Sequence, residues 1–194
     1  MKRSESRATR YNLVGRMFHW LMAIMVLSTL FVGVGMTSSL QWRPLLLNTH
    51  LLLGVSIFAL VIVRIVNRLT SPSPGHPEDF APWQALGLAL AHLALYALMT
   101  ALPLVGWALL SAGGYPMPTV LGWALPPLVK ADPQLYSILH QAHEIMAYGL
   151  FGLILIHLAA ALVHAWIKKD GVFSRMTIGS QAENVQARAA NTTD

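Results

Sequence analysis

Four long apolar runs constrain this chain more than any other feature of its sequence. They lie near residues 14 to 36, 45 to 66, 85 to 111 and 137 to 167. Each reaches the roughly 20 residues that an α-helix needs to cross the hydrocarbon core of a bilayer. Hydrophobic residues make up 55% of the 194 residues, and charged residues only 11%. We therefore expect an all-α integral membrane protein, folded as one four-helix bundle.

The basic residues predict how this bundle is oriented. Eleven of the 13 Lys and Arg residues lie in the N-terminal segment, at the end of the second run or after the fourth, whereas the other two connections hold only Arg43 and Lys130. The positive-inside rule then places both termini in the cytoplasm. Topology also explains the net charge of +5, so no nucleic-acid partner is indicated. The chain has no cysteine, which excludes disulfides and thiolate-ligated metal centres.

The predicted transmembrane domain spans residues 14–170. The basic segment 1–13 resembles the start of a secretory signal, but the apolar run after it is longer than the roughly 7 to 15 residues of a signal core, so we expect a retained helix. Residues 71–82 are rich in proline and predict an inner connection, and residues 113–133 predict an ordered cap on the outer face. Residues 171–194 predict a flexible cytoplasmic tail.

Four of the eight histidines form two pairs matched in depth. His143 and His157 lie fourteen residues apart in the fourth run, which places them on one helix face, about 21 Å apart along the axis. His50 lies near the outer end of the second run, at the depth of His143. His19 lies near the inner end of the first run, at the depth of His157. Two facing imidazoles at each of two depths are the axial ligands that two b-type haems require.

Other interpretations of these residues stay open. A single intramembrane histidine can simply hydrogen-bond a neighbouring helix, whereas a zinc site fits two separated pairs poorly because no carboxylate or cysteine is near. Arg64 and Arg68 could bind haem propionates or snorkel to the interface, and Pro103 predicts a kink in the third run. Several glycines could make room for a flat macrocycle or allow close helix packing. They are Gly15, Gly33, Gly35, Gly54, Gly106, Gly149 and Gly152.

The four runs resemble the bacterial cytochrome b561 family, the small di-haem, quinone-linked cytochromes of the bacterial cytoplasmic (inner) membrane. The matching stretches are RMFHWLMA, NTHLLLGVSIFALVIVRIVNR, LAHLALYALMTALPLVG and AHEIMAYGLFGLILIHLAAALVHAWIKKDGVFSRM, which together cover all four runs. The resemblance implies that His19 and His157 are the iron ligands of an inner haem b. It likewise implies that His50 and His143 are the iron ligands of an outer haem b.

The same resemblance implies one of two functions. The first is a superoxide oxidase that takes electrons from superoxide at the outer face and passes them through the haems to ubiquinone. The alternative is a membrane-anchor subunit that carries electrons between a partner dehydrogenase or hydrogenase and the quinone pool. His140 stands where the superoxide-oxidising type leads us to expect a lysine, so electrostatic attraction of a small anion rests on Arg43 and Lys130, partly offset by Asp132 and Glu144. A third interpretation, a haem-free transporter or structural bundle, lacks the paired broken helices of many transporters.

His164 and His92 remain once the four ligands are assigned. Both lie toward the cytoplasmic side, where a titratable ring could hydrogen-bond a quinone carbonyl or transfer a proton, so both are candidates for a quinone or proton site. The simpler interpretation is an interfacial residue for His164 and a helix-packing hydrogen bond for His92. On the other helices, we expect no partner of matching depth for His164 other than His92.

Overall fold

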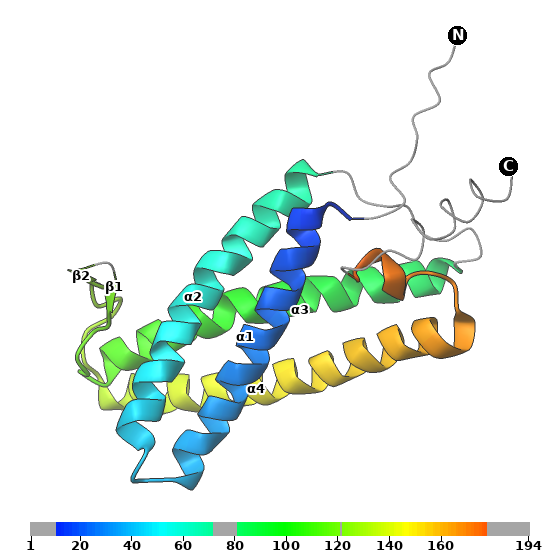
Figure 1. Ribbon diagram of the computed structural model, residues 1–194. Helices are drawn as coiled ribbons and strands as arrows, with labels where there is room; N and C mark the ends of the chain where they lie inside the picture. The colour runs from blue at the N-terminus through cyan, green and yellow to red at the C-terminus, as the bar shows by residue number, and fades with distance from the viewer. Residues whose placement is uncertain (1–10, 72–80, 121, 178–194) are drawn as a thin grey trace, which may run out of the picture.

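The structure, a computed structural model, describes residues 11–71, 81–120 and 122–177. Its long helices are α1 (Leu13–Ser38), α2 (Arg43–Thr70), α3 (Pro82–Ala112) and α4 (Pro133–Leu162) (Figure 1). Strand β1 (Thr119–Val120) pairs antiparallel with β2 (Trp123–Ala124) between α3 and α4. Helix α4 continues as a π-helix, Val163–Lys168, and the 3-10 helix Phe173–Arg175 follows it.

Short-range signals determine where the helices begin. Asn12 caps α1, because its side-chain oxygen accepts a hydrogen bond from the Gly15 amide at 2.8 Å. Asp132 caps α4 by accepting hydrogen bonds from the two amides that follow Pro133. Helices α2, α3 and α4 each carry a proline in the first turn, where its missing N–H removes no helical hydrogen bond. Pro103 lies inside α3 and does not end it.

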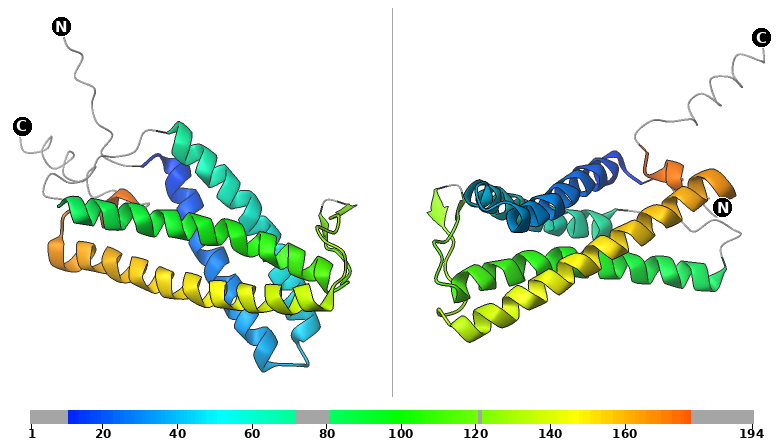
Figure 2. Two further views of the ribbon diagram at one scale, coloured as in Figure 1. Left: turned by 180° about the vertical axis from the view of Figure 1, so that it is seen from behind. Right: turned by 90° about the horizontal axis from the view of Figure 1, so that it is seen from below.

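The four helices are arranged as two antiparallel hairpins that cross each other. Helices α1 and α2 lie side by side, as do α3 and α4, and the two pairs form two layers (Figures 1 and 2). The start of α1, the end of α2, the start of α3 and the end of α4 lie toward one end of the bundle, which we call the inner end following the predicted orientation. The β1–β2 hairpin lies at the opposite, outer end. The predicted four-helix bundle is confirmed.

The surface of the bundle suits a lipid environment. All four helices, α4 together with its π-helical extension, are long and apolar enough to cross a membrane. Large apolar side chains point outward along them; for example, Phe31 is 69% exposed and Ile156 66% exposed. Soluble proteins rarely expose contiguous apolar surface of this extent to water. With α4 counted through its π-helical extension to Lys168, the helices start one to four residues before the predicted runs and end one to four residues after them.

The buried core is a thin apolar layer between the two predicted histidine pairs. Val26, Ile57 and Leu150 follow His19, His50 and His143 by seven residues each, and Leu95 and Leu102 of α3 complete the layer. Seven residues are two helical turns, or about 10 Å along the axis. The layer therefore makes the space between the two pairs apolar.

The outer connection is held by hydrogen bonds. The Trp107 indole N–H donates to the Pro126 carbonyl at 2.9 Å, and the Leu128 amide donates to the buried Ser111 hydroxyl at 3.0 Å. These bonds tie the segment after the β1–β2 hairpin to the end of α3, as an ordered cap requires.

The first residues of the predicted tail, 171–177, lie against the start of α1. Arg16 donates to the Thr177 carbonyl at 2.8 Å, and the Trp20 indole donates to the Met176 carbonyl at 2.9 Å. A hydropathy pattern cannot reveal such contacts, because they join side chains on one element to backbone carbonyls of another. The prediction of flexibility for the rest of the tail, residues 178–194, falls outside the described residues, as does most of the proline-rich connection.

Candidate functional site

The predicted outer pair, His50 of α2 and His143 of α4, lies together. The two ring centroids are 6.1 Å apart and the ring planes are inclined at 67°. Each ring rests on a glycine of the neighbouring helix in its hairpin. A Cβ built on Gly33 of α1 would lie 3.6 Å from Cε1 of His50, and one built on Gly106 of α3 would lie 3.3 Å from Cε1 of His143. The two glycines therefore let the imidazoles lie directly against helix backbones.

The second ring nitrogen of each outer histidine faces that backbone. Among the described residues, Nδ1 of both His50 and His143 is buried without a hydrogen bond of ordinary geometry. The carbonyls that interact with the two rings are those of Thr29 and Leu102, each one turn before the glycine that the ring contacts. A metal-bound histidine commonly donates its second N–H to a backbone carbonyl, which fixes the ring and leaves the other nitrogen for the metal. This environment suits two metal ligands.

The spacing within both pairs also suits a metal ion between the rings. Metal–nitrogen bonds of about 2 Å on either side of one ion set two imidazole centroids about 6 Å apart. The predicted inner pair, His19 of α1 and His157 of α4, has its centroids 6.3 Å apart with the planes at 70°. Gly54 follows His50 by one turn on the same face, and a Cβ built there would meet no atom within 4 Å. The residues present therefore fit the haem groups expected from the sequence.

A third imidazole belongs to the inner pair. The ring of His92 from α3 lies 5.7 Å from that of His157, centroid to centroid, with the planes inclined at 66°. His92 thus contacts His157. The inner site combines three histidines from three helices.

Arg64 of α2 connects three helices beside the inner pair. Its Nε donates to the Tyr96 hydroxyl at 3.0 Å, its Nη1 donates to the Gly15 carbonyl at 3.4 Å, and its Nη2 lies 3.1 Å from Nδ1 of His19. Within the described ranges no carboxylate lies at ion-pair distance from this guanidinium. An intramembrane cation of this kind is stabilised by an anionic partner. A haem propionate is a group of the right charge.

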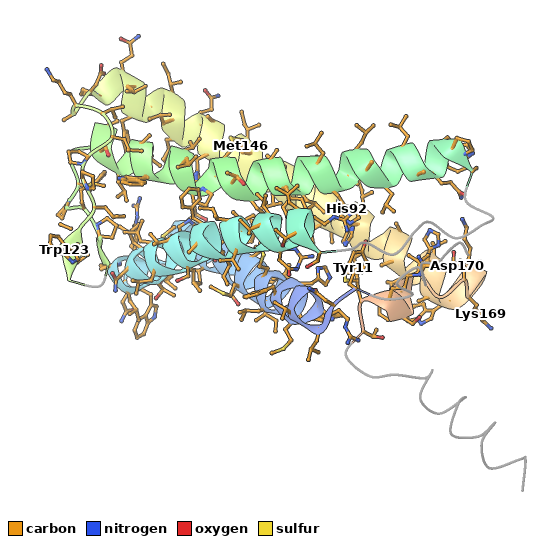
Figure 3. The ribbon with its side chains drawn as sticks, turned by 90° about the horizontal axis from the view of Figure 1, so that it is seen from above. Tyr11, His92, Trp123, Met146, Lys169 and Asp170 are labelled. Atoms are coloured by element: carbon orange, nitrogen blue, oxygen red, sulfur yellow. The ribbon has the colours of Figure 1, made fainter. Side chains whose placement is uncertain are left out.

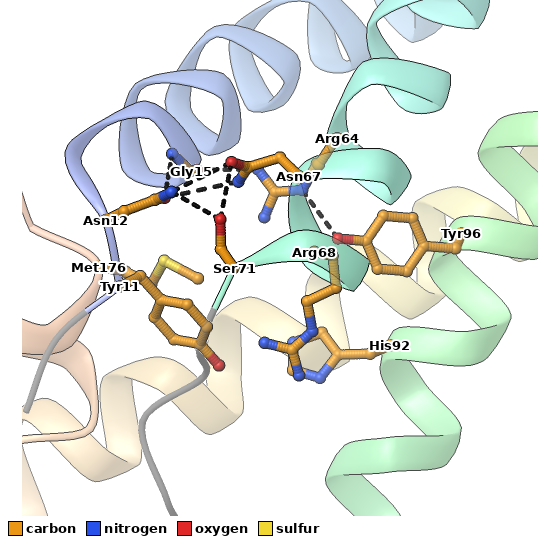
Figure 4. A pocket seen from close by; sticks show the side chains of 10 residues that line it. All are labelled: Tyr11, Asn12, Gly15, Arg64, Asn67, Arg68, Ser71, His92, Tyr96 and Met176. Carbon is orange, nitrogen blue, oxygen red and sulfur yellow. Dashed lines mark hydrogen bonds between the residues drawn. The ribbon is translucent and has the colours of Figure 1, made fainter. Parts of the chain in front are cut away.

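A pocket with several polar side chains in its lining lies at the inner end, and Arg64 and His92 are among its lining residues. Its lining residues are Tyr11, Asn12, Gly15, Arg64, Asn67, Arg68, Ser71, His92, Tyr96 and Met176 (Figure 4). Asn12 donates to Asn67 at 3.1 Å and to Ser71 at 2.9 Å. The guanidinium of Arg68 lies 5.4 Å from the centre of the Tyr11 ring. The pocket therefore offers hydrogen-bond donors, cations and an imidazole to a polar headgroup.

His164 has a carboxylate partner. Its Nδ1 lies 2.5 Å from Oδ2 of Asp170, whose Oδ1 accepts a hydrogen bond from the Val172 amide at 3.2 Å. Burial alone would raise the pKa of the Asp170 carboxyl, but the hydrogen bonds from His164 and Val172 outweigh it and hold this pKa below its ordinary value. Figure 3 shows Asp170 at the inner end and Trp123 at the opposite end of the molecule.

The sequence expectation for His164 considered only partners on other helices and did not include this carboxylate of the same chain segment. It assumed regular α-helical rotation through residue 164, whereas the helix becomes a π-helix at Val163. Lys169 then adopts a left-handed conformation with φ 52°, which turns the chain so that Asp170 reaches back to His164. No sequence signal for this turn was available, because a non-glycine residue rarely has positive φ.

Sequence reasoning also missed Tyr96, which anchors Arg64. Its signal was present, since Tyr96 lies one turn after His92 and so shares its helix face. The hydrogen bonds of Asn12 to Asn67 and Ser71 were missed as well. They join residues far apart in the chain, and spacing within one helix says nothing about them.

These features define a class of protein: a multi-pass, four-helix membrane bundle in which four histidines form two pairs, at two depths, with the spacing of haem ligands. The family model described as prokaryotic cytochrome b561 matches residues 10–179. The chain therefore belongs to the prokaryotic cytochrome b561 family, whose members are membrane cytochromes that bind haem b.

Curated relatives agree with this assignment. The chain is 30% identical over 171 residues to "Cytochrome b561 homolog 2" of Escherichia coli strain K12, covering 86% of this chain and 90% of the relative. It is 32% identical over 134 residues to "Cytochrome b561 homolog 1" of the same organism, covering 68% and 74%. It is 28% identical over 172 residues to "Probable superoxide oxidase CybB" of Yersinia pestis, covering 86% and 95%.

Proposed function

We propose that this protein is a di-haem cytochrome b that accepts single electrons at its outer end and delivers them to a quinone at its inner end. His50 and His143 hold the outer haem, and His19 and His157 hold the inner one. The observation that carries this proposal is the presence of two histidine pairs with metal-ligand spacing, separated by an apolar layer. Haem with two imidazole ligands supplies one-electron transfer and has no free position for oxygen.

The remaining polar residues at the inner end serve the quinone and the haem propionates. Arg64 is the proposed propionate contact, because it is an intramembrane cation with no carboxylate partner among the described residues. Reduction of ubiquinone to ubiquinol consumes two electrons and two protons. His164 and His92 are the proposed quinone or proton contacts, since both are imidazoles at this end of the bundle.

The proposed donor is superoxide, and the proposed location is the bacterial inner membrane with both termini in the cytoplasm. Two superoxide ions each lose one electron to give two O₂, and the two electrons with two protons convert ubiquinone to ubiquinol. The relative named as a probable superoxide oxidase supports this choice. Arg43 and Lys130, exposed at the outer end, would attract the anion electrostatically.

Stopped-flow spectroscopy of the purified protein tests the proposal. We expect superoxide to reduce the haems rapidly and a ubiquinone analogue to reoxidise them. His143→Ala should remove the outer haem and His157→Ala the inner one, so each variant should contain one haem and lose relay from superoxide to quinone. Haem reduction by dithionite but not by superoxide would refute superoxide as the donor.

His164→Ala tests the proposed quinone contact separately. We expect normal haem spectra and normal reduction by superoxide, but slower reoxidation by the ubiquinone analogue. Lys168→Ala, at an exposed position four residues further along the chain, is the matched control and should leave both rates unchanged. Equal reoxidation rates in His164→Ala and the wild type would remove His164 from the quinone site.

The second candidate function is that of an anchor subunit for a dehydrogenase or hydrogenase. The observation in its favour is the β1–β2 hairpin at the outer end, where the Trp123 side chain is 81% exposed and could contact a partner protein. This function predicts that the purified protein neither oxidises superoxide nor reduces quinone until the partner is added. Turnover by the isolated chain decides between the two candidates.

A further inference from the structure

The two histidine pairs differ in the charge that surrounds them. The guanidinium of Arg64 lies 3.1 Å from Nδ1 of His19, and its charge acts on His157 as well. The third inner imidazole, His92, faces the charges of both Arg68 and Arg64. Arginine keeps its charge at every physiological pH. The inner pair is therefore permanently next to a positive charge.

The outer pair has no such neighbour. Among the described residues no Lys or Arg acts on the rings of His50 and His143, whose environment is set by burial, backbone carbonyls and other imidazoles. Arg43 is exposed and precedes His50 by seven residues, or about 10 Å of helix. The formal charge directly next to His143 in the sequence is negative, the exposed carboxylate of Glu144.

We propose that Arg64 sets the direction of electron flow, because its fixed positive charge gives the inner haem a higher reduction potential than the outer haem. The proposal rests on the two haems of the proposed function. Reduction of a haem adds one negative charge, and a nearby cation stabilises that charge strongly inside an apolar bundle. Electrons that enter at the outer end then move inward, toward the quinone, because the inner haem has the higher reduction potential.

Tyr96 is the positioning residue in this arrangement. Its hydroxyl accepts the hydrogen bond from Nε of Arg64 at 3.0 Å, and the Gly15 carbonyl accepts another from Nη1. These two bonds, from α3 and α1, hold the guanidinium against the inner pair rather than in the open part of the pocket, and the close view shows Tyr96 directed at Arg64 (Figure 4). Tyr96→Phe would loosen the guanidinium while its charge remains.

A redox titration of the purified holoprotein, followed by its absorption spectrum, tests the proposal. Two midpoint potentials are expected, and the one that survives in His143→Ala, which lacks the outer haem, is assigned to the inner haem. Arg64→Gln should lower the inner potential by the equivalent of at least tenfold in the reduction equilibrium, about 59 mV for a one-electron couple. The midpoint potential of the outer haem should change by only a small fraction of that shift.

Three further variants separate charge from shape. Arg64→Lys keeps the positive charge, so the midpoint potential of its inner haem should stay close to the wild-type value. Tyr96→Phe should lower the inner potential by the equivalent of two- to threefold in the reduction equilibrium. This variant also tests the proposal if Arg64→Gln fails to retain the inner haem. Lys168→Gln removes an equal charge from an exposed position at the inner end and should change neither potential, because solvent screens it.

The proposal is overturned if Arg64→Gln and Arg64→Lys lower the inner potential equally, if both haems shift together, or if Tyr96→Phe leaves the inner potential unchanged. The titration uses neither superoxide nor quinone. Failure of the proposed donor or acceptor would therefore leave this result intact, whereas a protein with fewer than two haems would contradict the proposed function itself.

Discussion

Gly33 and Gly106 occupy equivalent places beside the outer histidines, yet they should respond differently to alanine. The new Cβ at Gly106 would lie 3.3 Å from Cε1 of His143, whereas the Cβ at Gly33 would lie 3.6 Å from Cε1 of His50. Carbon atoms pack best about 3.5 to 4.0 Å apart. Gly33→Ala therefore needs no movement, while Gly106→Ala must push the His143 ring by roughly 0.2 to 0.7 Å.

The energies of the two variants follow from these contacts. Replacing glycine by alanine inside a helix stabilises it by about 0.8 to 1.0 kcal/mol, and Gly33→Ala should retain most of this gain. Overpacking a tight site costs about 1 to 3 kcal/mol, so Gly106→Ala should be neutral or destabilising. The displaced ring should also alter the electron paramagnetic resonance signal of the outer low-spin haem.

Thermal unfolding and the resonance spectrum measure both effects. Gly87→Ala in α3 is the matched control, because Gly87 is exposed and a Cβ there meets no atom within 4 Å. It should stabilise the helix without changing either haem signal. The reasoning is refuted if Gly33→Ala and Gly106→Ala shift the outer haem signal equally, or if Gly106→Ala alters the inner haem signal instead.

Two further predictions concern the ends of α4. Asp132→Ala removes both hydrogen bonds at the N-terminus of α4 and should lower the free energy of unfolding by about 1 kcal/mol, measured by thermal unfolding; an unchanged midpoint would contradict the capping role. Asp170→Asn removes the carboxylate that holds His164, so hydrogen exchange of residues 171–177 should accelerate. Because the pKa of Asp170 lies below its ordinary value, its contribution in the wild type should be complete above that ordinary value, near pH 4, and should be lost only as the pH falls further. Faster exchange in the wild type already between pH 7 and 5 would argue against the carboxylate as the holding group.

Most of the fold could be predicted because it follows from the length and period of the apolar runs. A bilayer requires helices with internally satisfied backbones, so finding the runs is nearly equivalent to finding the helices. The histidine pairing could be predicted for a related reason. Helical rotation and rise convert a spacing of fourteen residues into a helix face and a depth in the membrane. Matching depth then predicted that His50 pairs with His143 and His19 with His157.

The rest of the site could not be predicted, because it depends on contacts between helices that spacing within one helix does not contain. Arg64 illustrates the limit. Its position near the inner end of α2 predicted a cation at the level of the inner haem, but the approach of Tyr96 and Gly15 from two other helices is what directs the guanidinium to His19. The sequence therefore predicts where both pairs lie, while the difference in charge between them emerges only when three helices meet. If that difference controls the direction of electron transfer, the chemistry of this cytochrome is set by tertiary packing at one residue rather than by the ligands themselves.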